Sequence, residues 1–184
     1  MTDNLIATNI ALFDPSYASV YVWDEDPSDP TNTNNYRLIN HADSDLAQDY
    51  LQVGQGFFVK SAIGGGSFTM TPDMQSHQTD VPFKRSTDWA SITLNANISN
   101  AKASTKISYR EDMTRGLDIG YDAGLLNSYP DFALYSRLIE DNGIDFSLQC
   151  LPTDFDNLII PIGLDAKANE MLSFGIEAKN LDEK

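Results

Sequence analysis

The sequence predicts an all-β protein, an antiparallel β-sandwich or jelly-roll-like module of about nine or ten strands. Apolar and polar residues alternate with a period of two along several short segments. Clusters rich in Gly, Pro, Asn and Asp separate these segments, and no long segment has helical periodicity. Short segments of this kind at regular spacing are typical of two-sheet β proteins.

Three segments alternate most clearly, as a half-buried strand requires. The inward positions are predicted to be Ile92, Leu94, Ala96 and Ile98 in the first, Ile144, Phe146, Leu148 and Cys150 in the second, and Leu172, Phe174 and Ile176 in the third. Shorter strands are predicted at residues 19–23, 56–62, 66–72, 105–111, 132–138 and 157–164. Only residues 44–52 and 122–128 have the composition of short helical turns.

The length of 184 residues fits one module, and residues 1–184 are predicted to form a single β-sandwich. The polar residues 76–86 interrupt the strand pattern and mark the best place for a minor seam. One cysteine, Cys150, excludes an internal disulfide framework and a Cys-based zinc cluster.

The chain is strongly acidic, with a formal net charge of −15 at pH 7. This charge argues against a nucleic-acid partner, because such partners are bound by clustered Lys and Arg. No run of about 18 apolar residues is present, so membrane insertion is not predicted. An acidic surface of this kind is typical of a solvated protein in an extracellular setting.

Several stretches, taken in order, resemble a known family. They are "VYVWDED", "YLQVGQGFFVKSAIGGGSFTMTPDMQSH", "FKRS", "WASITLNA", "RGLDIGYDAGLLN", "ALYSRL", "FSLQCLP" and "IIPIGLDA". The family is the β-rich region of large secreted or cell-surface Bacteroidetes proteins that precedes a C-terminal domain directing type IX secretion. The Gly-Asn-Pro-Tyr opening common in that family is replaced here by "NLIATNIALFDPSY", and no sorting domain is expected within residues 1–184.

The resemblance implies a β-sandwich that is a fragment of a larger protein, exported to the cell surface or the medium. It implies neighbouring domains in the parent protein as partners. It implies no catalytic activity, because the region accompanies many different enzymes and adhesins.

The residues themselves do not predict an enzyme. A Ser or Cys nucleophile needs a base, and the two histidines, His41 and His77, lie in polar turns. Cys150 is on the inward side of a predicted strand, where cysteine behaves as a small hydrophobic residue. No catalytic residue is therefore assigned, and a hydrolase ranks below the binding and structural functions.

Calcium is the one cofactor that the sequence suggests, because acidic loops supply the oxygen ligands that calcium prefers. Residues 24–35 contain the candidate ligands Asp24, Asp26 and Asp29. The loop does not fit an EF-hand, since Asp29 is where glycine is needed. The alternative is a solvated loop whose Asp and Asn side chains cap turns.

A second acidic stretch, "RGLDIGYDAGLLN", contains Asp118 and Asp122 between glycines. The resemblance makes it a structural corner between two strands and one of the family's most recognisable marks. Asp122 would then cap a short helical turn over residues 123–127. The alternative is that both carboxylates bind one cation, and the structural role is favoured because it needs fewer ligands.

Aromatic residues form the candidate ligand site. Sugars stack on exposed aromatic faces while polar groups fix their hydroxyls. Alternation predicts Trp89 on the outer side of its strand, and Trp23 shares a side with Tyr21. The predicted ligand-binding residues are Trp23, Tyr36, Trp89, Tyr121 and Tyr129. The alternative is that loops or a neighbouring domain cover these rings.

The sequence thus predicts a non-catalytic extracellular module that binds carbohydrate or mediates adhesion, with a polysaccharide or surface glycan as partner. The alternative function is a structural spacer that precedes the sorting domain and has no ligand of its own.

Overall fold

The structure is a computed structural model that describes residues 2–23, 36–42, 50–51, 54–75, 89–126, 131–140, 142–154 and 158–181. The predicted seam at 76–86 lies outside these residues, as do Asp24, Asp26, Asp29 and Tyr129. The described elements are helix α1 (Thr2–Asn9), strands β1 (Val20–Trp23), β2 (Tyr36–Ile39), β3 (Ala90–Ile98), β4 (Ala101–Tyr109), β5 (Ala123–Gly124), β6 (Ala133–Ser136), β7 (Phe146–Leu151), β8 (Ile162–Asp165) and β9 (Ser173–Lys179), and 3-10 turns η1 (Ile10–Leu12), η2 (Pro15–Tyr17) and η3 (Pro72–Met74). The fold is mostly β, as predicted.

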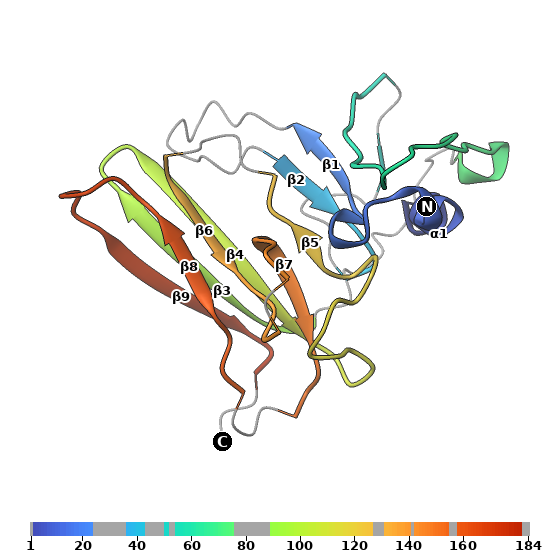
Figure 1. Cartoon of the computed structure of the whole chain (residues 1–184). Coiled ribbons are helices and arrows are strands. Elements are labelled where there is room, and N and C mark those ends of the chain that lie inside the picture. The colour runs from blue at the N-terminus through green and yellow to red at the C-terminus, as the bar shows by residue number, and fades with distance from the viewer. Residues whose placement is uncertain are drawn as a thin grey trace, which may run out of the picture.

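The larger of two sheets is curled and has the strand order β8-β6-β7-β4-β3-β9, with β5 added beside β7 (Figure 1). Strands β3 and β4 form its longest hairpin, joined by the two residues Ser99 and Asn100. Strands β4 and β7 pair in parallel, while the other strand pairs are antiparallel. The sheet is therefore mixed, and the purely antiparallel arrangement predicted from the sequence is wrong in this respect.

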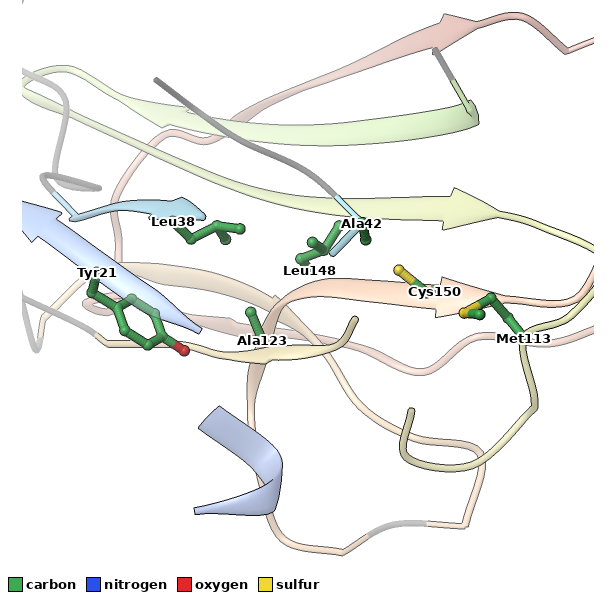
Figure 2. Close-up of a cluster of buried hydrophobic side chains, with 7 residues drawn as sticks. All are labelled: Tyr21, Leu38, Ala42, Met113, Ala123, Leu148 and Cys150. Carbon is green, nitrogen blue, oxygen red and sulfur yellow. The ribbon is translucent and has the colours of Figure 1, made fainter. Parts of the chain in front are cut away.

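The second sheet consists of β1 and β2, and it packs against one face of the larger sheet. The hydrophobic cluster between them is shown in Figure 2, and we call it the inter-sheet cluster. Its buried members are Tyr21, Leu38, Ala42, Met113, Ala123, Leu148 and Cys150. The inward prediction for Leu148 and Cys150 is confirmed, since both are buried in this cluster.

A third layer covers the other face of β1 and β2, where helix α1 packs. Leu5 and Ile6 of the helix are buried together with Val20, Val22 and Ile39. Asn9 at the end of α1 is buried, and its amide both donates to Thr69 O at 2.9 Å and accepts from Thr69 N at 2.7 Å. These two hydrogen bonds satisfy the backbone N–H and C=O of Thr69 and hold the segment around this residue against the helix.

The far face of the larger sheet has two further buried clusters. One contains Ala96, Ala101, Ala103, Phe132 and Leu134. The other contains Ile107, Tyr109 and Leu151. Between the described elements, the chain therefore buries apolar side chains on both faces of the larger sheet, as a sandwich-like arrangement requires.

Several local predictions are wrong. The sequence did not predict helix α1, and residues 56–62 and 66–72 are not strands. Within these two segments only Phe58 and Ser61 form isolated β-bridges. Residues 123–124 form strand β5 where a short helical turn was expected, because they pair with β7. Long-range pairing here outweighs the local preference of the sequence.

Strand β9 exists where the alternation predicts it, but its apolar side is not covered. Phe174 is 65% exposed and Ile176 is 72% exposed, and only Leu172 packs in part against a buried cluster. The prediction that Phe174 and Ile176 point into the core is therefore wrong. Alternation identifies the two sides of a strand, whereas burial depends on a second layer.

No helix in the described part of the chain is long and apolar enough to span a membrane.

Candidate functional site

Two predicted ligand-binding residues, Trp23 and Tyr36, lie opposite each other on strands β1 and β2. Their ring centroids are 5.2 Å apart, in an edge-to-face arrangement with an interplanar angle of 80°. Tyr36 makes a similar contact with Phe58, at 5.7 Å and 86°. We call Trp23, Tyr36 and Phe58 the aromatic row. Trp23 is 45% exposed and Phe58 is 52% exposed, so the row reaches solvent.

The alternation of β1 explains why these rings share a side. Val20 and Val22 are buried against α1, which leaves Tyr21 and Trp23 on the opposite side. Tyr21 is buried, and its hydroxyl donates to Gly124 O at 2.8 Å. Burial raises the pKa of the Tyr21 hydroxyl, so the group stays neutral and donates that bond. Tyr21 thus anchors the strand while Trp23 projects beyond the covered part.

Phe58 joins the row through its backbone. The N–H of Tyr21 donates to Phe58 O at 2.9 Å, and the N–H of Phe58 donates to Tyr21 O at 2.7 Å. Residues paired in this way direct their side chains to the same side. The neighbours Phe57 and Val59 pack on the opposite side, against the α1 cluster. Phe58 was not among the predicted ligand-binding residues, although a Phe-Phe pair in an extended segment must place one ring on each side.

Two other predicted residues, Trp89 and Tyr121, meet in a separate group. Their rings are stacked, with centroids 6.2 Å apart and an interplanar angle of 22°. The guanidinium carbon of Arg110 lies 4.9 Å from the centre of the Trp89 ring and 5.9 Å from that of Tyr121. His41 adds a tilted contact with Tyr121 at 5.4 Å. Arg110 was not among the residues predicted for this site.

Trp89 differs from its predicted placement, because it does not project freely from the outer side of its strand. Trp89 and Tyr121 are both half-buried and pack at the margin of the inter-sheet cluster. The guanidinium of Arg110 stabilises this pair by a cation–π interaction. Much of the Trp89 surface is therefore used for packing, and the rings of the aromatic row are the more accessible platform.

The two aromatic groups lie near opposite ends of β2. Tyr36 is the first residue of that strand, and His41 follows its last residue by two positions. At about 3.3 Å per residue, roughly 16 Å of extended backbone separates them. Asn40 ties this end of β2 to the second group, because its amide donates to Tyr121 O at 2.7 Å. The predicted residues thus form two places rather than one.

The corner of residues 114–126 contains Asp118 and Asp122. Asp122 is fully buried, and its carboxylate accepts the N–H of Asp118 and the N–H of Cys150, each at 2.7 Å. Burial raises the pKa of Asp122 to about 7, although the two N–H donors favour the charged form. The charge of Asp118 raises this pKa further.

Asp118 stabilises the same corner. Its carboxylate accepts the N–H of Thr114 at 2.7 Å and the Thr114 hydroxyl at 3.2 Å. Its backbone oxygen accepts the N–H groups of Tyr121 and Asp122 at 3.0 and 2.9 Å. Gly120 has φ +83°, and a Cβ there would lie 2.9 Å from Cδ2 of His41. Both aspartates therefore hold a tight turn, but Asp122 is not the N-cap of a helical turn as predicted.

Both carboxylates are occupied by backbone donors, and this arrangement differs from a calcium site, in which oxygens converge on one ion. Within the described residues, no group of three or more His, Cys, Asp or Glu side chains could hold a metal ion. The other predicted ligands, Asp24, Asp26 and Asp29, lie outside the described residues.

Comparisons with protein-family models, with curated proteins and with solved structures find no match for this chain.

Proposed function

We propose that this chain is a non-catalytic, extracellular carbohydrate-binding or adhesive module, and that the aromatic row is its binding surface. The observation that carries the proposal is the position of Trp23 and Phe58. Both rings are about half exposed and lie on one side of the small sheet, joined by Tyr36. Exposed aromatic rings that cluster on one surface mark a place where another molecule binds.

Carbohydrate suits this surface better than a charged polymer. A pyranose ring presents C–H groups that pack on an aromatic face, and this contact needs no net charge on the protein. The net charge of −15 would repel a polyanion. We therefore favour a neutral polysaccharide or surface glycan as the ligand.

The wider setting is part of the same proposal. Order and spacing of the sequence stretches that resemble the type IX-associated region support a secreted or cell-surface location within a larger protein. The jelly-roll-like sandwich also belongs here, since the small sheet lies over one face of the larger one across the inter-sheet cluster.

Affinity electrophoresis and isothermal titration against a panel of neutral polysaccharides test this function. Trp23→Ala and Phe58→Ala should each weaken binding by about tenfold or more, because each removes a stacking ring. Ile63→Ala is the matched control, since Ile63 is fully exposed and lies outside the row. Unchanged binding in both row variants would show that the aromatic row is not the binding surface. No binding to any polysaccharide would favour the spacer function.

Calcium is a separate proposal for the acidic loop whose predicted ligands are Asp24, Asp26 and Asp29. A cation bound only by the folded chain raises its melting temperature, so a chelator should lower that temperature. An unchanged melting temperature would leave this loop as an ordinary turn.

A further inference from the structure

Strand β9 forms an edge of the larger sheet, and among the described residues no strand pairs with its outer side. We propose that a second copy of this chain pairs with this edge, with the two β9 strands antiparallel about a two-fold axis at Gly175. The resulting dimer would continue the sheet from one copy into the other. This proposal is independent of the aromatic row, which lies on the other sheet.

The edge is suitable for strand pairing. Residues 173–179 of β9 pair with residues 91–97 of β3 in one continuous register without a bulge. Among the described strands, none pairs with the opposite edge of β9. The strand contains no proline and no inward-pointing charge on its apolar side. Bulges, prolines and inward-pointing charges are features by which proteins block the pairing of edge strands. Strand β9 has none of these three, so its edge can pair with another strand.

The apolar side chains of β9 are complementary to themselves. Phe174 and Ile176 are 65% and 72% exposed and lie on the same side of the strand. In an antiparallel pair centred on Gly175, each Phe174 lies opposite the partner's Ile176. Four exposed apolar side chains then become neighbours across the two strands. A shift by one residue would place apolar side chains opposite polar ones, so it is excluded.

Charge distinguishes the registers that remain. A pair centred on Glu177 would place two glutamates directly opposite each other, which is destabilising. A pair centred on Ile176 would place the two Glu177 side chains diagonally across the strands, where they are still neighbours. The pair centred on Gly175 places Glu177 opposite the partner's Ser173, and Lys179 lies beyond the end of the partner's β9. Like charges therefore do not face each other in this register.

The overall charge sets how the dimer should respond to salt. Two chains that each carry −15 repel at long range, and salt screens that repulsion. Apolar contacts across β9 are not weakened by salt. Dimerisation should therefore become tighter as ionic strength rises, whereas binding of a basic partner to an acidic surface would become weaker.

Sedimentation velocity of the full chain in 50 and 500 mM NaCl tests the proposal. The expected result is a monomer–dimer equilibrium whose dissociation constant decreases at high salt. The double change Phe174→Ser and Ile176→Ser should raise that constant by at least about tenfold. Ile63→Ser is the control, because it removes an exposed apolar side chain away from β9. Circular dichroism establishes that each variant is folded.

One further variant tests the register. Gly175→Cys should give a disulfide-linked dimer under mild oxidation, because directly opposed residues have Cα atoms about 4.5–5.5 Å apart. Ile63→Cys should not, and the native Cys150 is buried in both variants.

A chain that stays monomeric at both salt concentrations up to about 1 mM overturns the proposal. So does a dimer that tolerates both serine substitutions. A monomer that instead binds a synthetic extended peptide of alternating Val and Lys would assign the edge to a basic partner, and this result also overturns the proposed second copy.

Discussion

The carboxylate of Asp122 accepts the backbone N–H of Cys150 at 2.7 Å, and this bond ties the corner of residues 114–126 to strand β7. The second oxygen accepts the N–H of Asp118, within the corner itself. One fully buried side chain therefore joins a local turn to the centre of the larger sheet. The stability of the corner should depend on it.

Asp122→Asn should lower the free energy of unfolding by about 1–3 kcal/mol. The side-chain NH₂ group would face one of the two backbone N–H donors and leave that N–H group without an acceptor. Urea denaturation followed by circular dichroism measures the change. Asp154→Asn is the control, since Asp154 is exposed and its pair with Arg115 is at the surface. Equal stability of the two variants would contradict the structural role of Asp122.

The same carboxyl should make stability depend on pH. Burial raises the folded-state pKa of Asp122 from 3.8 to about 7, so between these values the folded chain holds a proton that the unfolded chain has lost. The contribution of this group is therefore complete below about pH 4, and it declines as pH rises to about 7. The stability difference between wild type and Asp122→Asn, measured from pH 4 to 8, should narrow over this interval. A difference that stays constant would show that Asp122 is ionised throughout.

Gly124 on β5 lies directly under the ring of Tyr17. A Cβ at this position would lie 2.5 Å from Cε1 of Tyr17, and the ring also carries Lys60 Nζ at 3.4 Å from its centre. Gly124→Ala should therefore destabilise the fold by about 1–3 kcal/mol through overpacking. Gly116→Ala is the control, because its Cβ would meet only Thr114 Oγ1, at 3.7 Å. Thermal melting compares the two, and equal melting temperatures would show that the Tyr17 ring moves aside.

Asn9 holds the segment around Thr69 against α1. Its amide makes two hydrogen bonds to the backbone of Thr69 and donates a third to Leu5 O at 2.8 Å. Asn9→Ala should lower the free energy of unfolding by about 1–3 kcal/mol, because three backbone groups lose their hydrogen-bond partner, and the bond to Leu5 O is buried. Asn142→Ala should cost less, since Asn142 is exposed and accepts one N–H bond. Hydrogen exchange at Thr69 should accelerate in the first variant alone, and unchanged exchange there would contradict the role of Asn9.

The sequence predicted the strands whose alternation is longest, and β3, β7 and β9 occur where it placed them. It did not predict that β4 and β7 pair in parallel, because that pairing joins segments far apart in the chain and leaves no local pattern. Helix α1 was missed because only one side of a short helix is apolar and Asn9 has a low helix preference. Tertiary packing stabilises it instead.

The candidate site was predicted as a set of residue types rather than as a place. The alternation of β1 predicted that Trp23 shares a side with Tyr21, and Tyr36 lies opposite Trp23 on β2. Phe58 and Arg110 were missed, since their positions depend on backbone pairing and on a stacked ring that only the folded chain brings together. The exposure of Phe174 shows the same limit, because alternation cannot reveal whether a strand is covered.

The pairing of β3 with β9 joins residues 91–97 to residues 173–179. The edge of β3 therefore stays unsatisfied during synthesis until almost the whole described chain has emerged, and contacts of such long range form slowly. A chain whose larger sheet is completed this late stays incompletely folded for longer.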